Sequence, residues 1–167
     1  MTAAAGAQPI EVFIADYRNA AHATALVGLL DAYAGDPAGG GTPLDPAVLA
    51  GLPSALAARP QAFSVLAFDG GQPVGLINCI EGFSTFACKP LVNVHDVVVL
   101  PSHRGQRVAQ KMFSLVEEEA RRRGACKLTL EVLSGNAPAL RAYEREGFAG
   151  YQLDPAFGTA VFLQKRL

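Results

Sequence analysis

The residues from Val94 to Ala109, VHDVVVLPSHRGQRVA, are the part of this sequence whose types and spacing point to a chemistry. A run of β-branched apolar residues breaks at Leu100-Pro101 into a basic turn that contains a glycine, and a helix pattern follows. A strand that ends in such a turn directs several backbone N–H groups and the positive end of a helix dipole toward one point. The segment therefore predicts a site for a phosphate or pyrophosphate.

The same turn resembles the acyl-CoA pyrophosphate loop of the GCN5-related N-acetyltransferases (GNAT), whose pattern is Arg or Gln, two residues, Gly, one residue, then Gly or Ala. Arg107 stands where that family usually has the middle glycine. A helical φ is open to Arg107, and its guanidinium can pair with a phosphate. The alternative interpretation is a basic turn of structural use only. The resemblance implies that the coenzyme is held by Arg104, Gly105, Gln106, Arg107, Val108 and Ala109.

Acetyl transfer from a thioester to an amine needs a route for the ammonium proton, polarisation of the thioester carbonyl and a proton for the departing thiolate. In the family that the chain resembles, the strand before the loop separates from its neighbour and offers main-chain groups to the coenzyme. The resemblance implies that Val97, Val98 and Val99 supply these contacts. Their side chains by themselves indicate only a buried strand.

Two residues of the later segment NAPALRAYEREGF fit the same reaction. By resemblance, Tyr143 contacts the coenzyme and is the general acid that protonates its thiolate, and Asn136 hydrogen-bonds the coenzyme arm. The alternative for Tyr143 is a core residue on an apolar helix face, a common position for tyrosine.

His95 and Asp96 are the other informative pair. The polyamine-acetylating branch of the family carries a Glu-Asp pair at the matching place, and the glutamate helps to remove the proton of the amine. An imidazole can accept a proton near neutral pH, so the resemblance implies that His95 is the catalytic base. Strand alternation predicts His95, Val97 and Val99 on one face of the sheet and Asp96 on the other. A half-buried histidine bonded to a neighbour is the alternative.

Apolar periodicity predicts the elements that must position these residues. They are, in order, strand 10–15, helices 17–34 and 45–58, strands 62–68, 74–80 and 91–100, helix 106–123, strand 126–132, a helix from Asn136 to Gly147, and strands 148–153 and 159–164. Asp45 and Asn136 are suitable N-caps, and Gly124 is a suitable C′ residue. Pro53 is expected to kink or divide the second helix.

The run from Glu117 to Arg123 places three glutamates four residues before three arginines. Pairs at this spacing lie on one helix face, and cations suit a helix C-terminus. The arrangement predicts a solvated helical face that needs no ligand.

The predicted order, β-α-α-β-β-β-α-β-α-β-β, is the order of the family that the chain resembles. We therefore expect an α/β (α+β) fold: one GNAT-like domain over residues 10–167, after a flexible leader over 1–9. Its central sheet is expected to be mixed, largely antiparallel and twisted, with about seven strands and about four flanking helices.

Composition excludes several classes of protein. The formal net charge of −1 over 167 residues gives no sign of a nucleic-acid partner, for which a basic patch is typical. The three cysteines have no C-x-x-C spacing, which argues against a disulfide framework and a zinc site. The sequence contains neither a convincing signal peptide nor an apolar run of the roughly 20 residues that span a bilayer. A cytoplasmic protein without membrane attachment is expected.

These features together predict an N-acetyltransferase that moves the acetyl group of acetyl-CoA, as co-substrate and without a metal, to a primary amine. A small molecule is the expected acceptor, and a protein or peptide is the less favoured one. An acyl-CoA-binding domain without turnover is the alternative, and a nucleotide or phosphate site is a third. A homodimer is expected because free sheet edges in this family often pair.

Overall fold

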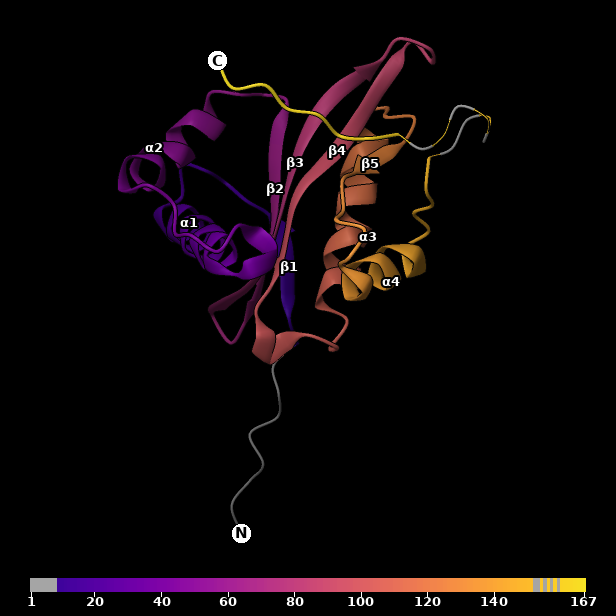
Figure 1. Cartoon of the computed structure of the whole chain (residues 1–167). Helices are drawn as coiled ribbons and strands as arrows, with labels where there is room; N and C mark the ends of the chain where they lie inside the picture. The colour runs from indigo at the N-terminus through magenta and orange to yellow at the C-terminus, as the bar shows by residue number, and fades with distance from the viewer. Residues whose placement is uncertain (1–8, 152–153, 155, 157, 159) are drawn as a thin grey trace. The chain divides into compact units, whose positions relative to one another are not determined.

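The computed structural model describes residues 9–151, 154, 156, 158 and 160–167 (Figure 1). Apart from Pro9, the predicted leader lies outside these residues. Contacts divide the chain into two compact units, and the boundary in the sequence lies between Leu130 and Glu131. Among the described residues, the first unit holds the sheet and three α-helices, and the second holds one α-helix.

The first unit is built on a five-stranded sheet in which the strands lie in sequence order. Each neighbouring pair is antiparallel except the last, which is parallel because a helix connects its two strands. The strands are β1 (Glu11–Ile14), β2 (Ala62–Asp69), β3 (Gln72–Ser84), β4 (Lys89–Val99) and β5 (Leu128–Leu130).

The helices begin and end close to the predicted positions. Those of the first unit are α1 (Ala20–Gly35), α2 (Pro46–Ala57) and α3 (Val108–Arg122), with short 3-10 helices η1 (Pro37–Gly39) and η2 (Pro101–His103). The side chain of Asp45 accepts a hydrogen bond from Ala47 N, which confirms the predicted N-cap. Pro53 lies inside α2 without dividing it.

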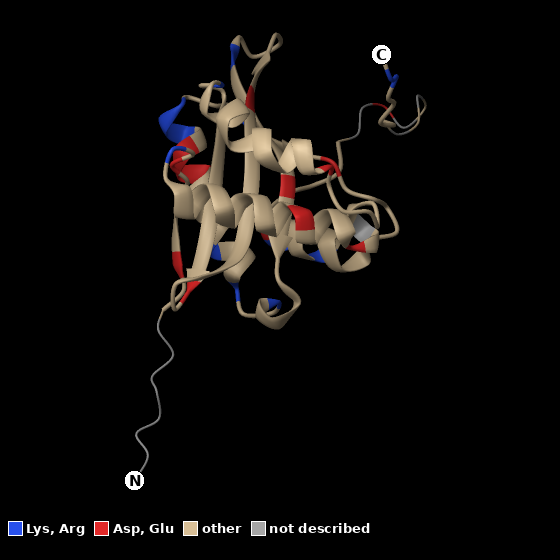
Figure 2. Cartoon of the chain, turned by 90° about the vertical axis from the view of Figure 1, so that its left-hand side faces the viewer, with Lys and Arg blue, Asp and Glu red and all other residues tan. Residues whose placement is uncertain are grey.

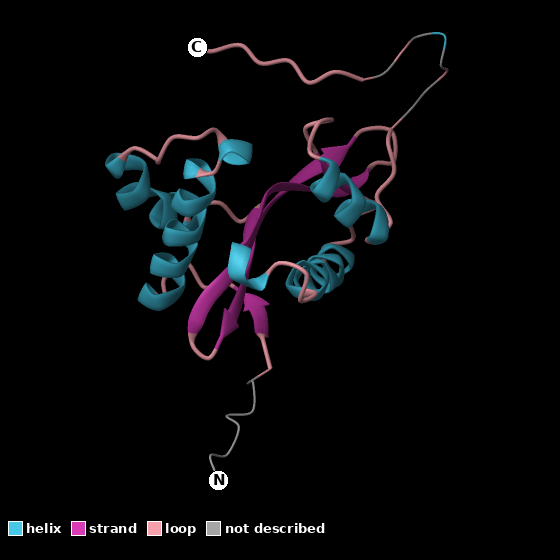
Figure 3. Ribbon diagram, turned by 60° about the horizontal axis from the view of Figure 1, so that its bottom comes forward, coloured by secondary structure: helices cyan, strands magenta, loops and turns pink. Residues whose placement is uncertain are grey.

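Helices cover both faces of the sheet. In Figure 3, α1 and α2 lie on one side of the strands and α3 lies on the other. On the α1 face, Leu26 and Leu29 pack with Leu66, Leu76 and Val98 in a buried cluster. The apolar face of α1 therefore contributes to the core, as its periodicity predicts.

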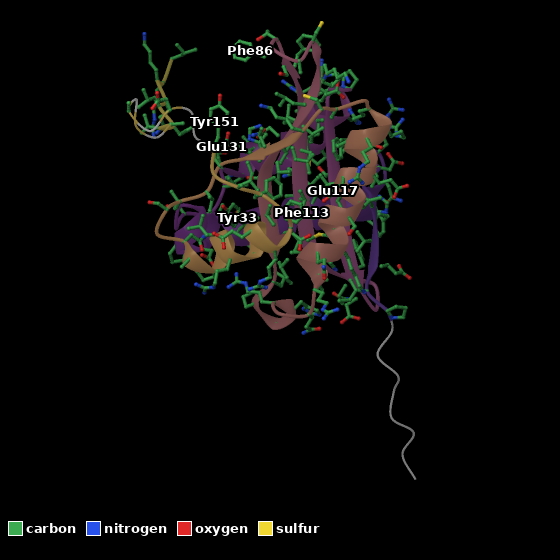
Figure 4. All side chains as sticks on the ribbon, turned by 90° about the vertical axis from the view of Figure 1, so that its right-hand side faces the viewer. Tyr33, Phe86, Phe113, Glu117, Glu131 and Tyr151 are labelled. Carbon is green, nitrogen blue, oxygen red and sulfur yellow. The ribbon has the colours of Figure 1, made fainter. Side chains whose placement is uncertain are left out.

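The opposite face brings α3 very close to the strands. Met112 and Phe113 are fully buried there, and Figure 4 labels Phe113 on α3. A Cβ atom at Gly75 on β3 would lie only 2.9 Å from Met112 Cε. A glycine at this position therefore allows the close packing of helix and sheet.

The end of α3 differs from the solvated face that the sequence predicts. Arg121 and Glu117 form an exposed pair, but the side chain of Arg123 is only 17% exposed. Its guanidinium reaches Glu119 Oε1 at 2.6 Å and Glu81 Oε2 at 3.1 Å, and it lies 4.7 Å from the centre of the Phe63 ring. Arg123 therefore joins α3 to β2 and β3, because the helix ends directly over these strands.

The strand count differs from the prediction, with five strands instead of about seven. Residues 148–151 and 160–164 form no strand, and residues 152, 153 and 159 lie outside the described part of the chain. Val161, Phe162 and Leu163 are all more than 70% exposed. An alternating apolar pattern favours a strand only where a partner strand completes the ladder, and these segments have none among the described residues.

The second unit contains α4 (Ala137–Arg145), which begins at the predicted N-cap. Asn136 Oδ1 accepts from Ala139 N at 3.3 Å. At the other end, Gly147 adopts a φ of 86°, Gly147 N donates to Glu144 O, and Phe148 N donates to Tyr143 O. These two bonds form a Schellman motif, so the predicted stop at Gly147 is confirmed.

Across the described residues, no helix combines the length and the apolar character that crossing a membrane requires.

Candidate active site

The turn between β4 and α3 has a backbone that favours glycine at two positions. Gly105 has a φ of 77°, and Arg107, the N-cap of α3, has φ 62° and ψ 20°. The expectation of a helical φ at Arg107 is therefore wrong. The chain has to turn sharply from the strand into the helix, and a left-handed residue at Arg107 makes that turn. This geometry explains why a glycine suits the position in the family that the sequence resembles.

The turn also presents a set of backbone donors. The first backbone bond into α3 runs from Lys111 N to Arg107 O at 3.1 Å. Within the described part of the chain, the N–H groups from Gly105 to Gln110 find no backbone acceptor. Unpaired N–H groups at a helix N-terminus, together with the helix dipole, favour an anion. The geometry therefore fits the predicted pyrophosphate site.

Side chains anchor the turn on both sides. Arg104 Nε donates to Val99 O at 3.1 Å, and its guanidinium lies 3.7 Å from Asp36 Oδ2, just after α1. His103 Nε2 lies 3.1 Å from Asp69 Oδ2 at the end of β2. A hydrogen bond therefore connects Arg104 to Val99, two residues that are predicted to contact the coenzyme.

Strand β4 loses its second neighbour as it approaches the turn. β5 pairs with β4 only from Val92 to Val94. Val97, Val98 and Val99 pair with Ile77, Leu76 and Gly75 of β3. On their other side, the described residues form no ladder, so main-chain groups of this stretch have no strand partner there.

A β-bulge separates the two halves of β4. Asn78 pairs with Asp96 while the next residue, Cys79, pairs with Val94. His95 is the extra residue between them, and it is exposed. Two residues of β4 therefore lie opposite one residue of β3.

The bulge overturns the predicted alternation of faces. Val94 and Val97 pair with Cys79 and Ile77, which are two residues apart and so share a face of β3. Strict alternation would have put Val94 and Val97 on opposite faces. The grouping of His95 with Val97 and Val99 is therefore wrong, because an inserted residue shifts the face of each residue before it.

A row of polar side chains crosses the sheet to this bulge. Tyr17 Oη lies 2.9 Å from Ser64 Oγ, Ser64 Oγ lies 2.6 Å from Asn78 Oδ1, and Asn78 Nδ2 lies 3.0 Å from Asp96 Oδ2. Ser64 and Asn78 are buried. The sequence patterns did not predict this row, although Ser64 and Asn78 are polar residues inside otherwise apolar strand segments.

Burial and negative charge shape the electrostatics of the α1 face. Burial raises the pKa of the Tyr33 hydroxyl, and the carboxylates of Asp96 and Asp36 raise it further. Burial likewise raises the pKa of Tyr17. Both phenols are therefore protonated at neutral pH, and they can donate hydrogen bonds.

The remaining predicted residues belong to the second unit. Tyr143 is half-buried on α4, and its ring meets Phe148 edge-on at a centroid distance of 6.0 Å. This contact joins the C3 and C″ positions of the Schellman motif, so it fixes the tyrosine ring on the helix. Asn136 caps the same helix. The roles of Tyr143 and Asn136 at a coenzyme site remain predictions from the resemblance.

The described residues contain no group of three or more His, Cys, Asp or Glu side chains that could hold a metal ion. Cys79 is buried and its pKa is raised by that burial, which disfavours the reactive thiolate.

The chain thus has a mixed sheet with helices on both faces, and a donor-rich turn joins the fourth strand to a helix. This arrangement can be compared with that of known proteins. The profile of the acetyltransferase (GNAT) family matches residues 26–148. The chain belongs to this family.

Two relatives of known name match about half of the chain. The streptothricin acetyltransferase of Streptomyces lavendulae is 39% identical over 92 residues, which are 52% of this chain and 49% of the relative. The aminoalkylphosphonate N-acetyltransferase of Salmonella typhimurium is 34% identical over 83 residues, 50% of this chain and 54% of the relative. The chain thus spans about half the length of these relatives.

Solved structures share the fold. The aminoglycoside N-acetyltransferase AAC(6')-Iy, solved in complex with CoA, superposes with a TM-score of 0.73 at 16% identity. The match covers 97% of each chain. At this identity the likeness shows a common fold.

Proposed function

We propose that the protein is an acetyl-CoA-dependent N-acetyltransferase that acetylates a primary amine of a small molecule by direct attack. One observation carries the proposal: within the described residues, the N–H groups from Gly105 to Gln110 have no backbone acceptor at the start of α3, in the turn that follows β4. Membership of the acetyltransferase family supports it. A protein or peptide acceptor is the less favoured form of the same proposal.

The coenzyme would bind along β4 and the turn. The pyrophosphate would accept hydrogen bonds from the N–H groups between Gly105 and Gln110, and the guanidinium of Arg107 would add a positive charge. Main-chain groups from Val97 to Val99 would pair with the amides of the coenzyme arm. The cap uses Asn136 Oδ1, so a bond from Asn136 to the coenzyme would come from its Nδ2 group.

The reaction would need one base and one acid. His95, exposed in the bulge, would take the ammonium proton directly or through water, so that the nitrogen lone pair of the neutral amine attacks the thioester carbon. The C–S bond breaks, and Tyr143 would give its hydroxyl proton to the departing thiolate. The second proton, which the nitrogen loses as it becomes the amide, would restore the Tyr143 hydroxyl. No acetyl-enzyme forms in this scheme, so a trapped acetylated side chain would contradict it.

The charge pattern favours a cationic acceptor. Between Arg18 and Arg59 the sequence has no Lys or Arg, and it has Asp31, Asp36 and Asp45. Figure 2 shows α1 and α2 without any blue. An acceptor with several amino groups would be attracted to this side, whereas a phosphonate would be repelled. Of the two named relatives, streptothricin acetyltransferase is thus the better guide to the acceptor.

The test is a thiol-release assay with acetyl-CoA over diamines, aminoglycosides, streptothricin and aminoalkylphosphonates, repeated with Tyr143→Phe and His95→Ala. Removal of a general acid or base is expected to lower kcat by about 100-fold or more, while the KM for acetyl-CoA changes little. His22→Ala, on α1, is the matched histidine control and should keep kcat. Unchanged rates in Tyr143→Phe and His95→Ala would overturn the catalytic assignment.

A coenzyme-binding domain without turnover is the second candidate, and the left-handed Arg107 favours it. This candidate predicts that acetyl-CoA raises the melting temperature while no amine of the panel releases thiol. If ATP or NAD protects the protein as well as acetyl-CoA does, the turn is instead a general nucleotide site.

Location in the cytoplasm is also a proposal. Cys79, Cys88 and Cys126 are free thiols in the structure, and free thiols suit a reducing compartment. Cell fractionation with an antibody against the protein would test it, and recovery outside the cytoplasmic fraction would contradict it.

A further inference from the structure

The polar row from Tyr17 to Asp96 follows the register of the sheet. Ser64 on β2 lies opposite Asn78 on β3, and Asn78 lies opposite Asp96 on β4. Tyr17 precedes α1 and closes the row at its other end. The four side chains therefore connect the start of α1 to the bulge at His95.

The proton positions in the row follow from the chemistry of its groups. A carboxylate only accepts hydrogen bonds, so the amide Nδ2 of Asn78 must face Asp96 and its Oδ1 must face Ser64. Ser64 then uses its one proton on Asn78, and Tyr17 must donate to Ser64. Burial raises the pKa of Tyr17, which keeps this donor protonated. All donors therefore point toward the carboxylate of Asp96.

The row exists only in the bulged register. If β4 continued without the bulge after Val94, His95 would lie opposite Asn78 and Asp96 would lie opposite Ile77. Ile77 is fully buried. The regular register would therefore remove the amide partner of Asp96 and turn a carboxylate toward an apolar core, which is unfavourable.

We propose that Asn78 is a positioning residue. It holds Asp96 by one carboxylate oxygen, fixes the bulge, and thereby sets where His95 and its backbone N–H are presented. The kinetic part of this inference rests on the proposed acetyl transfer, whereas the part that concerns the bulge does not.

The main test replaces Asn78 by alanine, with Cys79→Ala as the matched control. Cys79 is the next residue of β3, is 1% exposed and pairs with Val94 outside the bulge. Cross-strand NMR contacts report the register in the free protein. Without the bulge, β4 can keep only one of the two pairings Val97–Ile77 and Val94–Cys79. In Asn78→Ala we therefore expect one of these contacts to be lost. In Cys79→Ala we expect both to remain.

The kinetic readout separates positioning from general stability. A displacement of about 1 Å at a reacting group can cost on the order of 100-fold in rate, so kcat of Asn78→Ala should fall at least about 10-fold. The KM for acetyl-CoA should change less than about 3-fold, because the turn from Arg104 to Ala109 is untouched. Cys79→Ala should lower the melting temperature and keep kcat.

A swap of the two polar residues provides the rescue. Asn78→Asp alone sets two carboxylates opposite each other, and we expect the bulge contacts to be lost. Adding Asp96→Asn restores an amide donor and a carboxylate acceptor of the same shape. The double variant should regain the cross-strand contacts, which also keeps the test informative if Asn78→Ala fails to fold.

The outcomes separate the positioning role of Asn78 from the proposed acetyl transfer. A bulge that persists in both Asn78→Ala and Asn78→Asp, or a kcat that falls equally in Asn78→Ala and Cys79→Ala, overturns the positioning role. If the bulge is lost as expected but the wild-type protein acetylates no amine, the positioning of the bulge stands and the proposed acetyl transfer fails.

Discussion

At the scale of single residues, Arg107 shows how one backbone angle explains a sequence pattern. Its φ of 62° puts an L-residue in the left-handed region, which costs roughly 1–2 kcal/mol because Cβ crowds the following carbonyl. Glycine avoids this cost. The chain therefore keeps a cation in the predicted pyrophosphate turn at the expense of stability.

Arg107→Gly should separate these two effects. We expect the free protein to gain about 1 kcal/mol, which for a chain of this size raises the melting temperature by roughly 2–4 °C. The KM for acetyl-CoA should rise, because a phosphate partner is lost. Thermal unfolding and initial rates measure the two effects.

Arg107→Ala is the control, since it removes the cation but keeps a Cβ atom. It should raise the KM for acetyl-CoA similarly without raising the melting temperature. A glycine variant less stable than the alanine variant would show that the left-handed backbone carries no strain.

At the scale of elements, the last turn of α3 is held to the sheet by charge. Glu119 is buried, and it receives hydrogen bonds from Arg122 at 2.6 and 2.7 Å and from Arg123 at 2.6 Å. Arg123 continues to Glu81 on β3. The carboxylate of Glu119 thus joins the last turn of α3 to Arg123, whose guanidinium packs on β2 and β3.

This cluster should make stability depend on pH. The hydrogen bond from Arg122 lowers the pKa of Glu119, and Arg123 lowers it further against the opposing effect of burial. A carboxyl with a lower pKa in the folded than in the unfolded chain stabilises the fold above its unfolded pKa. That contribution is lost as the pH falls through the folded pKa.

Glu119→Gln is therefore expected to lose about 1–3 kcal/mol of stability at pH 7. The difference from the wild-type protein should shrink below about pH 4, the ordinary range of a glutamate. Thermal unfolding by circular dichroism between pH 3 and 7 measures it. Glu118→Gln, an exposed neighbour, should change little. A constant difference across the pH range would contradict the assignment.

At the scale of the whole molecule, charge is divided along the sequence. Residues 19–58 carry three acidic side chains and no Lys or Arg, whereas residues 104–127 carry seven Lys or Arg and three Glu. The basic segment contains the predicted pyrophosphate turn, and the acidic one includes α1 and α2. This division would suit the anionic coenzyme and the cationic acceptor that we propose, and it would favour their encounter with the protein from solution.

Association into a homodimer stays a prediction. Among the described residues the sheet ends in β1, of four residues, and β5, of three, and edge strands of this kind can pair with a second copy. Sedimentation velocity at micromolar concentration should show a two-chain species. Ile14→Lys places a charge on the β1 edge and should shift the protein toward one chain. A wild-type protein that stays single at 100-fold higher concentration would contradict the prediction.

Most elements could be predicted from the sequence alone. Local periodicity, capping and turn residues predict helix α3 and its Gly124 end, the N-caps Asp45 and Asn136, and the strand that leads into the proposed coenzyme turn. These signals are readable because the interacting atoms lie within a few residues of each other.

The tertiary structure alone decided the bulge at His95, the left-handed Arg107 and the polar row to Asp96. The row joins Tyr17 to Ser64 and Asn78 to Asp96, residues that lie 47 and 18 positions apart in the chain. The register of paired strands sets such contacts, and one inserted residue changes every face before it. Local patterns cannot encode this, because the energy of a register depends on side chains that only the folded sheet brings together.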